Sequence, residues 1–330
     1  MIEEAVTITN SEVKAFDFYA QYAAAGYCNS ESAIGSTVTC SNNACPEVTA
    51  AGATIQSTFS GILTDIQGFV SVDDTNKLIV TSFKGSSSIR NWITDFVFLQ
   101  IPCDLTLGCL LHAGFSTAWE EVADEVLAGV KAAKAANPSY KIIFTGHSLG
   151  GAVATVGAGY VREEDGGSSY DIDIYTYGSP RPGNRAFVEH VSEQAGLEFR
   201  VTHTDDPVPR LPPILLNYRH TSPEYWFHTG GSNTTDYTAA DGEVCEGYAS
   251  LGCNAGTLGL DVEAHGYYFQ DISACGTGIE FRKTKRAAAA ANVTFDMATT
   301  EPEDVTDEEL EARLNDLVAQ DIEFVATLEE

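Results

Sequence analysis

Segment 141–152, KIIFTGHSLGGA, carries the residues of this chain that are best suited to chemistry. Its apolar, β-branched residues predict a strand that runs into the pattern G-x-S-x-G at Gly146, Ser148 and Gly150, followed by a helix from about Leu149. A serine on such a turn presents its hydroxyl at a helix N-terminus, where negative charge is favoured. The glycines fit because they lack a Cβ. The pattern predicts a nucleophilic serine; the competing interpretation is a glycine-rich turn with an idle serine.

A serine hydroxyl needs a histidine base, and that histidine needs a carboxylate that fixes its tautomer and orientation. For a serine on this kind of turn, the acid and then the histidine follow it along the chain. Asp205 and Asp206 both come after a predicted strand at 198–203, and the spacing does not choose between them. His265, in a late loop close to Cys275, is the candidate base.

Four other histidines have structural interpretations. His147 is predicted to pack beneath the turn that carries the serine, and His203 to be a core residue at the end of its strand. His220 and His228 flank an aromatic, strand-like stretch and are also predicted to be structural.

Predicted strands alternate with predicted helices over most of the chain. This alternation predicts an α/β fold with a mainly parallel central sheet and helices on both faces. In such sheets catalytic groups gather at the carboxyl ends of strands, which is where the candidate serine and aspartates lie. The predicted helices are 11–25, 117–137, 149–161 and 187–195; besides the strand before the serine, the predicted strands are 54–59, 68–72, 77–83, 171–177 and 198–203.

Composition narrows the class of protein. A chain of 330 residues can bury one large core, and no stretch approaches the ~18 apolar residues of a membrane span. The formal net charge of -29 argues against a nucleic-acid partner and against simple adhesion to anionic lipid. The cysteine and histidine spacing does not support zinc, and we expect neither a metal nor a cofactor.

Eight cysteines predict disulfides rather than metal ligands. Three close pairs would leave the first and last cysteines for each other, although sequence alone does not prove connectivity: Cys40–Cys45, Cys103–Cys109, Cys245–Cys253 and Cys28–Cys275. Disulfides predict a secreted, extracellular protein. Asn233 and Asn292 lie in N-x-T triplets and are glycosylation candidates. Met1-Ile-Glu-Glu lacks the pattern of a signal peptide, so we expect a mature secreted chain given a start Met.

The composition changes after Cys275. Residues 301–330 hold twelve acidic side chains and one arginine. Thr306-Asp-Glu-Glu309 has the pattern of a capping box and precedes an apolar helical stripe. An isolated helix of this length is marginal in water, so we expect it to dock on another part of the protein. The predicted organisation is a main domain at 1–282, a linker at 283–305 and an acidic amphipathic helical tail at 306–330. The stripe consists of Leu310, Leu314, Leu317, Val318, Ile322, Val325 and Leu328.

Several long motifs occur in the order found in one known family. Over residues 10–282 the chain resembles the class 3 lipases of filamentous fungi, most closely those of the Fusarium type. The motifs are FKGS at 83–86, IRNW at 89–92, TGHSLGGA at 145–152, YTYGSPR at 175–181, HTDDPVPRLPP at 203–213, SPEYW at 222–226 and AH at 264–265.

The resemblance implies an α/β-hydrolase fold and a secreted triacylglycerol lipase that forms an acyl-enzyme. It implies Ser148 as nucleophile, Asp206 as acid and His265 as base, which settles the choice between the two aspartates. It also implies an oxyanion hole formed by the backbone N–H groups of Ser86 and Leu149, with the Ser86 hydroxyl assisting. The same resemblance supports the four disulfide pairings.

The apolar residues after Gly85 alone predict a surface helix that faces the core. The resemblance implies instead a lid that covers the site until an oil–water interface attracts it, formed by Ser87, Ser88, Ile89, Arg90, Asn91, Trp92 and Ile93. Ile89 and Trp92 favour lipid esters over the soluble aromatic esters of a feruloyl esterase. Phospholipase A1 or galactolipase activity and a non-enzymatic binding module are further possibilities. Lys84, where the family often has arginine, and the acidic tail depart from the family pattern, and the oligomeric state stays open.

Overall fold

The computed structural model describes residues 6–86, 93–94, 96–163, 170–275 and 305–328. Within these residues the central sheet has eight strands, in the order β1-β2-β3-β6-β7-β8-β9-β10. The pairs from β3 to β9 are parallel, whereas β1–β2, β2–β3 and β9–β10 are antiparallel. The strands are β1 (Thr54–Ser60), β2 (Gln67–Asp73), β3 (Leu78–Phe83), β6 (Lys141–His147), β7 (Ile172–Tyr177), β8 (Glu198–His203), β9 (Glu224–Phe227) and β10 (Gly242–Cys245); β4 (Gln100–Pro102) pairs with β5 (Leu110–His112) in a separate ribbon.

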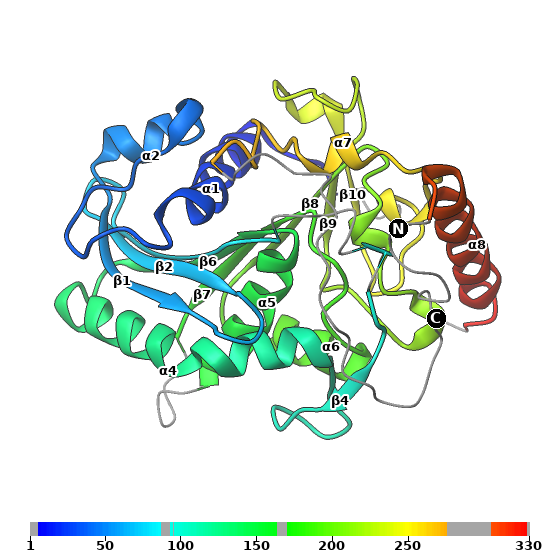
Figure 1. Ribbon diagram of the computed structural model, residues 1–330, viewed down its shortest axis with the longest axis horizontal. Helices are drawn as coiled ribbons and strands as arrows, with labels where there is room; N and C mark the ends of the chain where they lie inside the picture. The colour runs from blue at the N-terminus through cyan, green and yellow to red at the C-terminus, as the bar shows by residue number, and fades with distance from the viewer. Residues whose placement is uncertain (1–5, 87–92, 95, 164–169, 276–304, 329–330) are drawn as a thin grey trace.

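Helices cover both faces of this sheet (Figure 1). Successive side chains of a strand point to opposite faces, and β6 is apolar on both. Ile142 and Phe144 belong to the core beneath α4 and α5, whereas Ile143 belongs to the core beneath α1. The predicted α/β fold with a mainly parallel sheet is confirmed. The helices are α1 (Asn10–Asn29), α2 (Pro46–Ala51), α4 (Ala113–Ala136), α5 (Leu149–Glu163), α6 (Arg185–Glu193), α7 (Val262–His265) and α8 (Asp307–Val325).

Three helices begin earlier than the sequence predicts, because of their caps. Thr9, rather than Ser11, caps α1, and it forms a capping box with Glu12. The α4 helix begins four residues before the predicted start, because the His112 side chain accepts a hydrogen bond from the Gly114 N–H. The α6 helix begins two residues before the predicted start, because the Asn184 side chain accepts a hydrogen bond from the Phe187 N–H. None of these differences moves an element of the central sheet.

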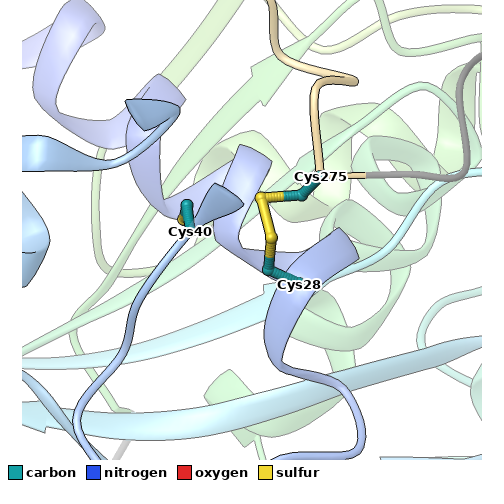
Figure 2. A group of neighbouring side chains, drawn as sticks. All are labelled: Cys28, Cys40 and Cys275. Carbon is teal, nitrogen blue, oxygen red and sulfur yellow. A yellow bond between two sulfur atoms is a disulfide. The ribbon is translucent and has the colours of Figure 1, made fainter. Parts of the chain in front are cut away.

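Four disulfides join the pairs that the spacing suggested: Cys28–Cys275, Cys40–Cys45, Cys103–Cys109 and Cys245–Cys253. Figure 2 shows that the first of them ties the end of α1 to the segment after α7, with Cys40 beside it. In the described part of the chain, the sulfur atoms of Cys28, Cys40 and Cys275 lie close enough together to hold a metal ion. All three are in disulfides, however, and a metal needs a thiolate.

The disulfides Cys28–Cys275 and Cys40–Cys45 are expected to differ in how much they stabilise the fold. Cys28–Cys275 spans 247 residues and Cys40–Cys45 spans 5. Closing the longer loop removes more entropy from the unfolded chain, so its loss should cost about 5 kcal/mol, against about 2 kcal/mol for the shorter one. Urea unfolding of the two double Cys→Ser variants, followed by tryptophan fluorescence, measures both values. Equal losses would contradict the explanation from loop length.

The acidic tail forms α8, at the opposite end of the molecule from β1 (Figure 1). The predicted capping box is present, since Thr306 and Glu309 satisfy each other's backbone N–H groups. Leu310, Leu314 and Val318 are buried, as is Val305 in the last position of the expected linker. The expected boundary at 282 lies outside the described residues. None of the described helices is long and apolar enough to cross a membrane.

Candidate active site

Ser148 lies on the turn between β6 and α5, at the carboxyl edge of the sheet. Its backbone φ is 58°, in the left-handed region that non-glycine residues rarely adopt. A Cβ on Gly146 would collide with the backbone of Gly150, and a Cβ on Gly150 would collide with the carbonyl of Phe83. The two glycines are therefore required because strand, turn and helix approach one another too closely for side chains.

The backbone after β3 passes directly beside this turn. Carbon atoms of Phe83 and Lys84 lie within 2.9 Å of the place where a Gly150 Cβ would be. Ser86 is two residues further along and half-buried. Leu149 is the first residue of α5, whose first bonds within the helix run from the Gly151 and Ala152 N–H groups to the Ser148 carbonyl. Among the described hydrogen bonds the Leu149 N–H has no acceptor, as is usual for the first N–H groups of a helix, which suits it to an oxyanion.

Asp206 and His265 form a buried pair. His265 Nδ1 donates a hydrogen bond to Asp206 Oδ2 across 2.8 Å, and both side chains have 0% exposure. Asp206 follows β8, while His265 ends the short helix α7, whose N-cap is Asp261. Asp205, the second candidate acid, is only half-buried. The structure thus places Asp206, rather than its neighbour, against the candidate base.

Ser148 and His265 are both buried, and the residue that precedes the serine lies against the histidine ring. The neighbour of the serine, His147, has its ring centroid 4.5 Å from that of His265. Among the described residues, Ser148 Oγ and His265 Nε2 are both buried without a hydrogen-bond partner. Because Nδ1–H donates a hydrogen bond to Asp206, the neutral ring has its lone pair on Nε2, and that atom can accept the serine proton.

His147 forms hydrogen bonds with both the candidate base and Tyr27. Its Nε2 donates to the His265 carbonyl across 2.8 Å, and its Nδ1 accepts from the Tyr27 hydroxyl, also across 2.8 Å. Burial, and then the nearby His265, lower the pKa of His147 well below its ordinary value, so this ring stays neutral. The prediction that His147 packs beneath the turn is confirmed, and its contact with His265 is new.

Tyr268 is a residue of the site that the sequence reasoning missed. Its hydroxyl donates to Asp206 Oδ2 across 2.5 Å, and Asp206 Oδ1 accepts from the Val208 N–H across 2.9 Å. Burial, and then the Asp206 charge, raise the pKa of Tyr268 well above its ordinary value, so the hydroxyl keeps its proton. The only signal in the sequence is its position three residues after His265.

The remaining predicted residues lie as follows. His203 is buried at the end of β8, where its ring bonds the Ala264 carbonyl and the Tyr237 hydroxyl. His220 is buried and bonds the Pro209 carbonyl, so both histidines are structural as predicted. Asn233 is exposed. The predicted lid residues Ser87, Ser88, Ile89, Arg90, Asn91 and Trp92, and the second glycosylation candidate Asn292, lie outside the described residues; Ile93 is buried in the core.

Comparison with known proteins identifies the family to which this chain is similar. Residues 80–216 match the family described as Lipase (class 3), and residues 2–57 match the Lipase 3 N-terminal region. The secreted mono- and diacylglycerol lipase 1 of Fusarium solani is 46% identical over 97% of this chain and 89% of its own length. The secreted mono- and diacylglycerol lipase A of Penicillium cyclopium is 41% identical over 84% of this chain and 91% of its own.

Solved structures agree with these relatives. A mutant form of the Penicillium cyclopium enzyme matches with a TM-score of 0.75 and 39% identity, over 81% of this chain and 99% of that one. A triacylglycerol lipase described as having a serine protease triad at its catalytic centre matches with a TM-score of 0.72 and 31% identity, over 82% of this chain and 99% of that one. The chain belongs to the class 3 lipase family of serine carboxylic ester hydrolases.

Proposed function

We propose that this protein is a secreted lipase that hydrolyses the ester bonds of acylglycerols through an acyl-enzyme. The observation that carries this proposal is the buried hydrogen bond between His265 and Asp206 beside the Ser148 turn. His265 Nε2 takes the hydroxyl proton while Ser148 Oγ attacks the ester carbonyl, and His265 then protonates the departing alcohol. Water repeats the two steps on the acyl-enzyme and releases a fatty acid.

The backbone N–H groups of Ser86 and Leu149 hold the oxyanion of each tetrahedral intermediate in this proposal. Support comes from the close passage of the β3 end past α5 and from the unpaired donors of the first turn of α5. Fixed donors of this kind stabilise charge that develops only in the transition state. No step requires a metal or a cofactor.

Access to the serine requires movement. Ser148 and His265 both have 0% exposure, so an ester cannot reach them unless a covering part of the chain is displaced. We assign that role to a lid at Ser87–Ile93, whose apolar residues Ile89 and Trp92 would face a lipid surface once displaced. The partners in this proposal are lipid esters at an oil–water interface.

An extracellular location fits several observations. The relatives named above are described as secreted, and four disulfides of the kind that form in oxidising compartments are present. The exposed Asn233 is available as a glycosylation acceptor. Within the acylglycerols, the names of the Fusarium and Penicillium relatives favour mono- and diacylglycerols as a second, narrower substrate class.

The proposal is tested by the hydrolysis rate measured against tributyrin concentration through the solubility limit. We expect a jump in rate once emulsion forms, because the interface displaces the cover over Ser148, and little turnover of methyl ferulate in parallel. Rates on diolein and triolein emulsions then separate partial acylglycerols from triacylglycerols as the preferred substrate. A smooth saturating curve with good ferulate turnover would contradict the lipase and indicate a feruloyl esterase. Rapid release of fatty acid from phospholipid or galactolipid would indicate a phospholipase A1 or a galactolipase.

A further inference from the structure

The acidic helix α8 is attached to the rest of the protein through a buried carboxylate. Asp321 is 3% exposed, and its two carboxylate oxygens accept hydrogen bonds of 2.8 Å from the backbone N–H groups of Ile214 and Leu215. The Arg181 guanidinium lies 3.5 Å from the same carboxylate. Two backbone donors and a buried cation form a site that fits one carboxylate, and α8 supplies it.

Arg181 also binds the segment that follows Asp206, and so connects this segment to Asp321. Its Nη1 donates to the carbonyls of Arg210 and Pro212, across 2.5 and 2.7 Å. Burial lowers the pKa of Arg181 to about 10, and the charge of Asp321 opposes that shift. Asp321 therefore balances a buried cation that itself holds segment 205–216, in which Asp206 lies.

A second contact reaches the segment that leads to the base. Asn315 Oδ1 accepts a hydrogen bond of 2.8 Å from the Gly259 N–H. The two segments are themselves joined by Arg210, whose guanidinium donates to the carbonyls of Thr257, Gly259 and Asp205. Through Asn315 and Asp321, α8 thus contacts both segment 257–265, which ends in His265, and segment 205–216.

Apolar packing supports these polar contacts. The α8 helix packs on the turns Ile214–Leu216 and Asn254–Gly256. Its buried residues Leu310 and Leu314 belong to the same core cluster as Val208 and Leu211, which follow Asp206. The α8 helix therefore packs against segments 205–216 and 257–265 from outside and shares a hydrophobic core with the first of them.

We propose that α8 is a clamp that fixes the position of segment 205–216, which contains Asp206, relative to segment 257–265, which contains His265. Asp321 is its principal positioning residue. This inference rests on the proposed function of Asp206 and His265. The hydrogen bond between them must keep its geometry through the reaction, and misplacement by about 1 Å is enough to slow catalysis greatly. The docked tail is then part of what fixes the active site, although it contributes no group to the chemistry.

The test compares Asp321→Asn with Asp316→Asn in the full chain. Both remove one negative charge from α8, but Asp316 is exposed and accepts only from Gln320 among the bonds described. For Asp321→Asn we expect kcat on soluble p-nitrophenyl butyrate to fall about tenfold with KM little changed. We also expect faster amide hydrogen exchange in segments 205–216 and 257–265. For Asp316→Asn we expect wild-type values of both.

Asn315→Ala keeps the test decisive if Asp321→Asn folds poorly. It removes the acceptor of the Gly259 N–H and leaves the buried carboxylate in place, so faster exchange should be confined to segment 257–265. The clamp is wrong if Asp321→Asn matches Asp316→Asn in kcat, or if its faster exchange is confined to α8. Hydrogen exchange does not depend on activity, so these results stay separate from a failure of the lipase proposal, which would appear as wild-type protein without esterase activity.

Discussion

Replacing Ser148 with alanine should lower kcat for ester hydrolysis by roughly 10⁴- to 10⁶-fold. The variant loses the oxygen that forms the acyl-enzyme, and only the oxyanion donors and substrate binding remain to accelerate attack by water. Alanine is smaller than serine and fits the same turn, so the fold should be retained. The measurement is kcat on p-nitrophenyl butyrate, with labelling by a fluorophosphonate probe as a second readout.

Ser116→Ala is the matched control for this prediction. Ser116 is also a buried serine, but it lies on α4 and its hydroxyl donates to Glu120. We expect this variant to react with the probe and to keep its activity. A Ser148→Ala protein that retains more than about a tenth of wild-type activity, or that is still labelled, would mean that another nucleophile carries the reaction.

The position of the nucleophile was predictable from sequence because its requirements are local. A strand, a sharp turn and a helix lie within a dozen residues, and Gly146 and Gly150 identify the turn because no other residue fits it. The sheet was predictable for a similar reason, since the apolar runs of β3 and β6 are buried on both faces. Local steric requirements leave a clear signal in a single chain.

The partners of the serine depend on contacts between distant segments. Asp206 and His265 are 59 residues apart, and spacing alone did not distinguish Asp206 from Asp205. Tyr268 and the contact from His147 depend on how α7 folds back over β6, which no local pattern encodes. Resemblance to a family resolved the acid, whereas the supporting groups required the structure.

In the acidic tail, too, a local sequence pattern did not predict a contact with a distant segment. The amphipathic stripe predicted both the helix and its docking, but it placed Ile322 on the docked face, where 46% of that residue is exposed. The neighbouring Asp321 is buried instead, because the body of the protein offers two backbone N–H groups and Arg181 at that position. A hydrophobic pattern does not identify a buried acid, since burying a charge is favourable only where partners are already in place.

Replacing Asp206 with asparagine should lower kcat on p-nitrophenyl butyrate by about 10⁴-fold while the fold is retained. The carboxylate accepts from His265 Nδ1, Tyr268 and the Val208 N–H, so it fixes the tautomer in which Nε2 is free. An amide group can donate to Nδ1 instead, and the ring proton then moves to Nε2, which can no longer take the serine proton. Circular dichroism checks the fold, and the rate of fluorophosphonate labelling reports how strongly Ser148 is activated.

Asp205→Asn makes the same chemical change one residue away. Asp205 is half-buried, and it is its backbone carbonyl, rather than its carboxylate, that accepts from Arg210. We expect the activity of this variant to stay within about threefold of wild type, because the carboxylate of Asp205 takes part in none of the described hydrogen bonds of the site. If Asp205→Asn were instead the inactive variant, Asp205 would be the acid, and the His265 ring would have to leave Asp206 before catalysis. The two asparagine variants together therefore test both the identity of the acid and the tautomer through which it acts.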